Sequence, residues 1–342
     1  MPKRVCVTGA NGFIAAHVVK QLLEGGHTVR GTVRDPANAK SVSHLTSLPG
    51  AAERLELFAA DLNRPGSFDA AMQTCDALMH IASPYVLTVK DAQRDLVDPA
   101  VNGTLEALRA AAKVPSLKVV VLTSSMAAVT DSPDPTHRYT EDDWNETSTL
   151  ERNPYYFSKT QAERAAWKFV QDSKPGFRLV ALNPPLVAGP SLSNGINTSV
   201  DLFVKIFKKQ FPGIVAFSWA MVDVRDVAKA HVLAMENDQA KGRYLCANVT
   251  VSMRELVAML RSHNPKNQWL PSASLEGRFG SALVLASTLV VPKGDAVFAR
   301  TNLGRPLHFD NSRIRRDLGL DFRAIEQTVN DTVDDLVKNG HI

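Results

Sequence analysis

Cysteine is scarce in this sequence. Cys6, Cys75 and Cys246 are spread over 342 residues, and their number is odd. A disulfide framework needs pairs, and a metal or redox centre needs cysteines a few residues apart, so we expect no disulfide and no metal site. Isolated thiols of this kind are typical of a reducing, cytoplasmic compartment.

Long hydrophobic stretches are also missing. The longest apolar run, residues 282–291, is interrupted by Ser287 and Thr288. It is shorter than the roughly 20 residues that cross a bilayer. Residues 1–4 lead directly into an apolar strand pattern, which leaves no room for a signal peptide. We expect no membrane association, and we expect the run to pack in the protein core or in the wall of a pocket.

Charge of one sign does not accumulate along the chain. The 39 basic and 35 acidic residues are interspersed and give a net charge of +4. Without a basic tail or stripe, nucleic acid is not an expected partner. The content of 44% apolar and 22% charged residues is ordinary for a globular protein, and the length allows two unequal lobes. A monomer and a homodimer both stay open.

Short apolar runs alternate with helical patterns over the first half of the chain. The runs cover residues 5–7, 28–33, 55–60, 77–82, 119–122 and 177–182. They predict an α/β fold with a doubly wound parallel sheet covered on both faces. The prolines within residues 183–190 predict that the chain leaves the sheet there. We assign residues 1–184 and 215–248 to the sheet domain, and residues 185–214 and 249–342 to a smaller, mainly helical lobe.

The first strand ends in a glycine turn. Gly9 and Gly12 lie between that strand and a helical pattern that begins near Ala16. This order is typical of a dinucleotide site, because glycines let the backbone turn sharply and approach a pyrophosphate, and the free N–H groups of the helix face the anion. An ordinary strand-to-helix turn is the alternative.

Two further stretches carry groups suited to proton transfer. Asn153 and Pro154 suit the start of a helix, which would place Tyr155 and Lys159 one turn apart on the same face. A phenol alone has a pKa of about 10, and a neighbouring cation favours its ionised form. Ser125 follows the fifth apolar run, at the sheet edge where the glycine turn also lies, so its hydroxyl could hold a carbonyl oxygen.

The alternatives at these positions are structural. Lys159 could form a surface pair with Glu163, four residues later, and Ser124 and Ser125 could cap a helix after the strand. We prefer Ser125 to Ser124 because successive residues of a strand point to opposite sides. The glycine turn, Ser125 and the pair of Tyr155 and Lys159 are independent features expected at one sheet edge, which favours a catalytic role over these structural ones.

The end of the second strand indicates which dinucleotide binds. An acid about 20 residues after the glycines favours the unphosphorylated cofactor, whereas an arginine accommodates a 2′-phosphate. Arg34 follows the strand directly, with Arg30 before it and Lys40 after it, and Asp35 is the opposing acid. The excess of cations predicts NADPH rather than NADH.

Together these stretches resemble the extended short-chain dehydrogenases/reductases, in the branch of dihydroflavonol and cinnamoyl-CoA reductases. The resemblance covers nearly the whole chain and rests on residues 8–15, 33–36, 61–62, 80–84, 99–104, 122–125, 155–159, 183–190 and 222–228. Two features depart from the family pattern: Ala15 stands where many relatives have glycine, and residues 276–300 form a longer, more apolar segment. That segment leaves the shape of the pocket, and hence the substrate, open.

The resemblance implies a Rossmann-type fold and a set of site residues. Ser125, Tyr155 and Lys159 match the catalytic triad, and Tyr155 and Lys159 would also contact the cofactor. The implied cofactor contacts are Gly9, Asn11, Gly12, Phe13 and Ile14 at the pyrophosphate, Arg34 and Lys40 at the 2′-phosphate, Asp61 and Leu62 at the adenine, and Ala82, Ser83, Pro184, Val187 and Ser199 around the nicotinamide. Pro84, Tyr85 and Met126 are the expected substrate contacts.

The function expected from these residues is NADPH-dependent reduction of aldehydes and ketones, with apolar or aromatic small molecules as substrates. An epimerase or dehydratase that retains its NAD(P) is one alternative, and a non-catalytic NADPH sensor is another. A sugar-nucleotide substrate needs polar and basic contacts, which the apolar run at residues 282–291 does not offer. Sensors of this fold typically lack the tyrosine–lysine pair that Tyr155 and Lys159 provide.

Overall fold

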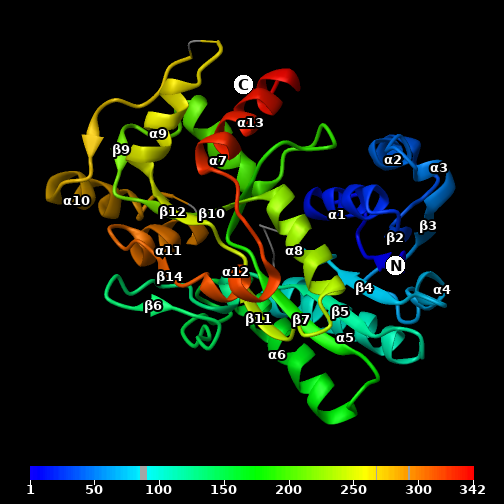
Figure 1. Cartoon of the computed structure of the whole chain (residues 1–342). Helices are drawn as coiled ribbons and strands as arrows, with labels where there is room; N and C mark the ends of the chain where they lie inside the picture. Colours follow the sequence, from blue (N-terminus) through cyan, green and yellow to red (C-terminus); the bar gives the residue numbers. More distant parts are fainter. Residues whose placement is uncertain (85–90, 267, 292) are drawn as a thin grey trace.

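A seven-stranded parallel sheet forms the centre of the computed structural model, which describes residues 1–84, 91–266, 268–291 and 293–342 (Figure 1). The strand order is β11-β7-β5-β4-β1-β2-β3, and neighbouring strands are parallel throughout. The strands are β1 (Arg4–Val7), β2 (Thr28–Val33), β3 (Leu55–Ala59), β4 (Ala77–His80), β5 (Val119–Thr123), β7 (Arg178–Asn183) and β11 (Gly242–Leu245). The expected doubly wound sheet is confirmed.

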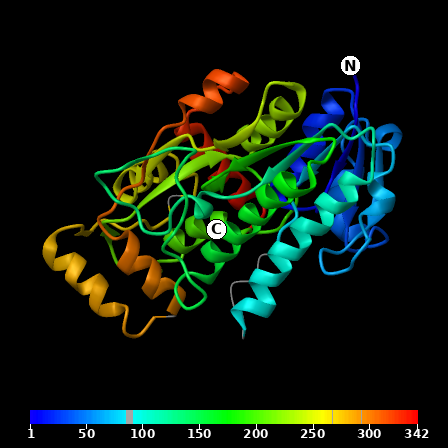
Figure 2. The same cartoon turned by 90° about the horizontal axis from the view of Figure 1, so that it is seen from below.

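Helices cover both faces of this sheet (Figures 1 and 2). One face packs against α1 (Phe13–Glu24) and α8 (Val224–Glu236), and the other against α4 (Asp69–Met72), α5 (Asp98–Ala112) and α6 (Pro154–Ser173). A π-helical turn, Gln93–Val97, leads into α5, and α2 (Ala39–Thr46) and α3 (Ala51–Arg54) connect β2 with β3. The alternation of β5 explains the two cores: Val119 and Val121 face α1 and α8, whereas Val120 and Leu122 face α5 and α6.

A second, smaller group of elements surrounds its own core (Figure 1). It contains the three-stranded sheet β12-β10-β8 and the pair β13-β9, while β14 pairs with β6. Its elements are β8 (Leu186–Ala188), α7 (Thr198–Phe207), β9 (Ile214–Val215), β10 (Ser218–Asp223), β12 (Val249–Ser252), α9 (Met253–Ser262), β13 (Ser274–Leu275), α10 (Arg278–Ser287), α11 (Lys293–Asn302), β14 (His308–Phe309) and α13 (Ile325–Lys338); β6 is Arg138–Tyr139. The remaining helix, α12 (Ser312–Leu318), packs through Ile314 and Leu318 on the core of the main sheet. The domain boundaries given above stay a prediction.

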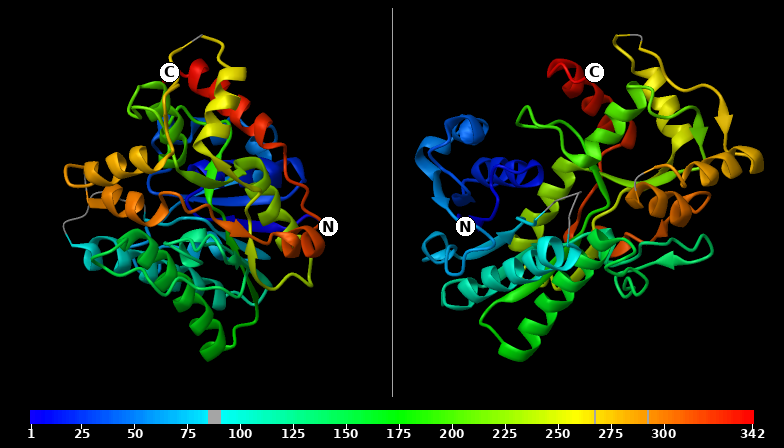
Figure 3. Two further views of the ribbon diagram at one scale, coloured as in Figure 1. Left: turned by 90° about the vertical axis from the view of Figure 1, so that its left-hand side faces the viewer. Right: turned by 180° about the vertical axis from the view of Figure 1, so that it is seen from behind.

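Most of the apolar run at residues 282–291 is exposed, so the expectation that it packs in the core is wrong, whereas a place in the wall of a pocket stays a prediction. Leu283, Leu289 and Val290 are 49%, 81% and 87% exposed. α10 and α11 form a hairpin at the edge of the smaller lobe (Figure 3). α10 packs on the lobe through Gly280, where a Cβ would lie 2.3 Å from the carbonyl oxygen of Leu275. Among the described residues, no helix combines the length and the apolar content that crossing a membrane requires.

Candidate functional site

The glycine turn after β1 favours glycine at two positions for different reasons. Gly9 has a φ of +62°, and a Cβ there would lie 3.1 Å from the Cβ of Ala82. Gly12 has an ordinary φ of −76°, but a Cβ there would lie 3.1 Å from the carbonyl oxygen of Gly9. The turn therefore lies close against the segment that follows β4.

The N-terminus of α1 fits an anion. Gly12 is the N-cap residue and offers no side-chain hydrogen bond, and the first turn of α1 contains no acidic residue. The N–H groups of that turn and the positive end of the helix dipole are therefore left for a ligand. Asn11 donates to the carbonyl of Ser41 at 3.4 Å, and Phe13 and Ile14 are half-buried beside the loop. These residues fit the pyrophosphate of a dinucleotide.

The hydroxyl of Thr8 connects this turn to the end of β4, a role that the sequence did not predict. Thr8 Oγ1 accepts the N–H groups of Ile81 and Ala82, each at 3.0 Å. Its own hydrogen then points to Nδ1 of His80, also at 3.0 Å. Burial, aided by the charge of Lys159, lowers the pKa of His80 to about 3, so the ring is neutral and accepts this bond.

Arg34 and Lys40 are exposed at the carboxyl end of β2 and in α2. The carboxylate of Asp35 accepts the N–H group of Ala37 at 3.0 Å, so it is engaged by its own turn. Arg30 does not belong to this group, contrary to the expectation from sequence. It donates to the carbonyl of Gln73 at 2.8 Å and pairs with Glu56 at 3.4 Å.

Asp61 and Leu62 follow β3, next to α5. Asp61 Oδ1 accepts the N–H group of Asn63 at 2.8 Å. Gly103 of α5 lies against Leu62, since a Cβ at Gly103 would come within 2.8 Å of Leu62 Cδ2. This close approach leaves Asp61 and Leu62 half-buried, in positions where a flat ring could contact them.

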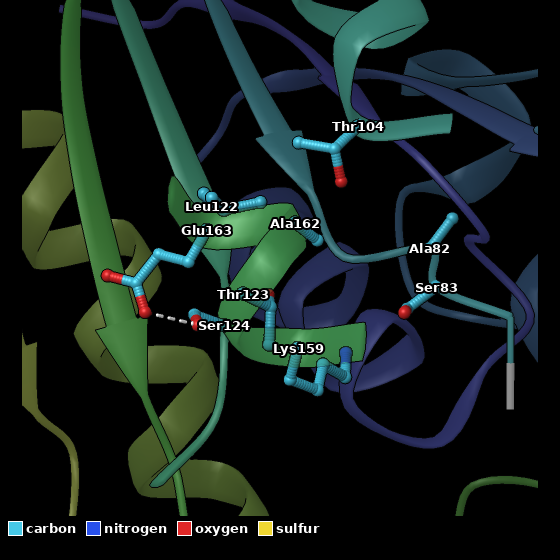
Figure 4. A pocket seen from close by; sticks show the side chains of 9 residues that line it. All are labelled: Ala82, Ser83, Thr104, Leu122, Thr123, Ser124, Lys159, Ala162 and Glu163. Carbon is cyan, nitrogen blue, oxygen red and sulfur yellow. Dashed lines mark hydrogen bonds between the residues drawn. The ribbon is translucent and has the colours of Figure 1, made fainter. Parts of the chain in front are cut away.

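A small cavity lies where β4 and β5 end beside α6 (Figure 4). The side chain of Lys159 extends from α6 toward the side of the cavity where Ser83 lies. Burial lowers the pKa of Lys159 to about 8, and the carboxylate of Glu163 partly opposes this effect. The cavity is lined by Ala82, Ser83, Thr104, Leu122, Thr123, Ser124, Lys159, Ala162 and Glu163.

The phenol ring of Tyr155 lies beside Lys159, whose Nζ is 6.0 Å from the ring centroid. The turn before α6 is set differently from the sequence expectation. Asn153 precedes α6 with φ and ψ both at 57°, but its side chain does not cap the helix. It donates instead to the buried carboxylate of Asp131 at 2.8 Å, which also binds Arg152. Asp131 thus holds a left-handed residue immediately before Pro154 and Tyr155.

The two serines after β5 point to different sides. Ser124 is buried and donates to Glu163 Oε2 at 2.6 Å (Figure 4). Ser125 is half-buried; its Oγ accepts the N–H group of Ala127 at 3.1 Å and lies 3.5 Å from the carbonyl oxygen of Pro184. Ser125 therefore caps the short helix that follows, and Ser124 is committed to a buried carboxylate.

The remaining predicted contacts are scattered around the site. Pro184 is buried and accepts the N–H group of Met126, and Val187 is buried in β8. Ser199 is half-buried at the start of α7. Met126, a predicted substrate contact, is only 5% exposed. It packs with Val129, Tyr139 and Leu245 as a residue of the core. Pro84 is half-buried, and Tyr85 lies outside the described residues.

The chain is similar to known reductases over nearly its whole length. The chain is 39% identical to cinnamoyl-CoA reductase CAD2 of Medicago truncatula, over 97% of this chain and 95% of that protein. The structure of Gre2 from Candida albicans in complex with NADPH is 33% identical with a TM-score of 0.82, covering 99% of each chain. Yeast methylglyoxal/isovaleraldehyde reductase Gre2 complexed with NADPH is 28% identical with a TM-score of 0.79, covering 99% of this chain and 100% of that one. Residues 5–249 match the NAD dependent epimerase/dehydratase family, and the chain belongs to this family of extended short-chain dehydrogenases/reductases.

Proposed function

We propose that this protein is an NADPH-dependent reductase that converts aldehydes and ketones to alcohols. The observation that carries the proposal is the half-buried Lys159, one helical turn from Tyr155, at the sheet edge that the glycine turn also borders. The reductases to which the chain is similar, two of them solved with NADPH, support the same reaction class.

The chain's own residues divide the reaction among themselves. When bound, NADPH supplies a hydride to the carbonyl carbon. Tyr155 gives its phenolic proton to the carbonyl oxygen, and the charge of Lys159 favours the phenolate that remains. The hydroxyl of Ser125 holds the same oxygen by a hydrogen bond. A proton from solvent then restores Tyr155 for the next cycle.

The preference for NADPH over NADH rests on the end of β2. Arg34 and Lys40 are exposed cations there, and the carboxylate of Asp35 is already engaged by the backbone of its own turn. Two exposed cations therefore lie beside one carboxylate, of which one oxygen is bonded to its own turn, and this balance favours a 2′-phosphate. The pyrophosphate would lie at the turn between Gly9 and Gly12, at the uncapped start of α1.

The test is NADPH consumption with a panel of aryl and branched alkyl aldehydes and ketones. We expect turnover by the wild type, and a loss of at least a hundredfold in kcat for Tyr155→Phe, in line with general acid catalysis. Tyr156→Phe is the matched control, because this neighbouring tyrosine has no role in the proposal. Absence of turnover, or a Tyr155→Phe variant with wild-type kcat, would overturn the proposal.

A retained-cofactor epimerase or dehydratase is the alternative that the family description keeps in view. Such an enzyme would copurify with NAD(P) and return the hydride to its substrate, so NADPH would not be consumed. Absorbance of the purified protein near 340 nm after reduction, combined with the carbonyl panel, distinguishes the two functions.

A further inference from the structure

We propose that Glu163 is a positioning residue for the reaction: it ties the segment that carries Ser125 to the helix that carries Tyr155 and Lys159. The inference rests on the proposed function. It differs from the surface pair of Lys159 and Glu163 that the spacing of four residues suggests, because the carboxylate of Glu163 is buried and bound by other donors.

Glu163 is the centre of a buried hydrogen-bond network. It is 1% exposed and projects from α6 toward the ends of the sheet strands (Figure 4). Its two oxygens accept bonds from Ser124 at 2.6 Å, Arg243 at 2.7 Å, Asn183 at 2.8 Å and Trp167 at 3.1 Å. Ser124 follows β5, Asn183 ends β7 and Arg243 lies in β11. One carboxylate therefore connects α6 to three adjacent strands.

Two paths lead from this carboxylate to Ser125. The first is covalent, because Ser124 precedes Ser125 and donates directly to Glu163. The second passes through Asn183, whose amide nitrogen donates both to Glu163 and to the carbonyl oxygen of Ser125, the latter at 3.1 Å. The backbone of Ser125 is thus held with reference to Glu163 from both sides.

The path to the other two residues runs along α6. Tyr155, Lys159 and Glu163 are spaced by four residues, so they lie along one side of the helix. A helix that slides or rotates on an apolar surface meets little directional resistance, whereas hydrogen bonds to a buried carboxylate set its register. The distance from Tyr155 to Ser125 depends on this register. A displacement of about 1 Å can reduce a rate a hundredfold, so a change of register should lower kcat.

The charges around the network are balanced. Arg243 is 6% exposed, pairs with Glu163 and donates to the carbonyl of Glu141. Its Cζ also lies 3.9 Å from the ring centroid of Trp144. Of the described groups near Lys159, Glu163 belongs to the same helix and raises the pKa of the lysine, whereas His80 of β4 is neutral. Loss of the Glu163 charge therefore moves the titration of Lys159 to lower pH.

The experiment compares Glu163→Gln, Glu163→Asp and Ser124→Ala with the wild type. For Glu163→Gln we expect kcat to fall 10- to 100-fold, NADPH affinity measured by fluorescence to change less than threefold, and the alkaline limb of the pH–rate profile to move to lower pH. Glu163→Asp keeps the charge but shortens the side chain. Its alkaline limb should therefore stay at the wild-type pH, while its kcat should remain low. This separation is not expected from a general loss of stability.

Asp226→Asn is the matched control, because Asp226 is a buried carboxylate of α8 that binds Arg323, and α8 lies on the sheet face opposite to α6. It should lower the melting temperature and leave kcat unchanged. If Glu163→Gln does not fold, Ser124→Ala decides, since it keeps the ion pair with Arg243 and should lower kcat three- to tenfold. Wild-type kcat in the folded variants overturns this inference alone, whereas a wild type without turnover overturns the proposed function and the inference with it.

Discussion

Arg34 is the residue on which we expect the choice of cofactor to depend. Its side chain is exposed after β2, and the competing carboxylate of Asp35 is engaged at 3.0 Å by the N–H group of Ala37. A hydrogen bond to a charged group contributes about 1.5 to 3 kcal/mol, and solvent exposure favours the lower value. With 1.4 kcal/mol per factor of ten as the general conversion, Arg34→Gln should weaken NADPH binding about tenfold and leave NADH binding unchanged.

Arg30 provides the matched control from the same strand. It carries the same charge, but its guanidinium binds the carbonyl of Gln73 and the carboxylate of Glu56, on the side away from the glycine turn. Arg30→Gln should lower the melting temperature and leave both affinities unchanged. The assay is titration of nicotinamide fluorescence with NADPH and NADH at low and high salt, where the tenfold difference should shrink as salt screens the exposed charge. Equal losses of affinity for the two dinucleotides in Arg34→Gln would refute the assignment of the 2′-phosphate to this residue.

Gly12→Val should abolish NADPH binding in the same titration without unfolding the protein, because its φ of −76° suits any residue while the new side chain would enter the turn 3.1 Å from the Gly9 oxygen; unchanged affinity would contradict the role of the turn. Burial lowers the pKa of His231 to about 4. The unfolded chain protonates this residue near pH 6.5, so acidification from pH 7 to 5 should cost about 2 kcal/mol of the free energy of unfolding through it. Urea denaturation of wild type and His231→Gln at both pH values measures this share, which the variant should lack. Burial also lowers the pKa of Lys159 to about 8, so its charge is present below that pH and lost above it. The kcat/KM for NADPH should therefore fall above pH 8, and Lys159→Arg should move the limb upward; an unmoved limb would assign it to another group.

The main sheet and the glycine turn could be predicted because their signals are local. β2 begins and ends where its apolar run does, and β1, β3, β4, β5 and β7 differ from their runs by one or two residues at one or both ends. A strand buried on both faces needs a continuous apolar run, and a turn at a φ of +62° needs a glycine, as at Gly9. Because the runs locate the strand ends, they also show which residues stand at the edge of the sheet.

Contacts between distant residues could not be predicted. Glu163 pairs with Arg243, 80 residues away, although the spacing in the sequence pointed to Lys159. Asn153 stands at the expected start of α6, but its side chain binds Asp131 rather than the helix. In both cases the residue type predicted a polar contact. The partner could not be predicted, because it depends on which elements the topology brings together.

The sequence by itself determined the class of site: a glycine turn, a cation after the second strand, and a tyrosine and a lysine one helical turn apart. These features depend on neighbours in the chain, where spacing alone sets geometry. Only the tertiary structure decided which serine faces the buried carboxylate, which arginine is left at the end of β2, and that the apolar run of α10 is exposed. The physical reason is that burial and hydrogen-bond partners are properties of packed elements, and an apolar or charged side chain carries no local record of what will cover it.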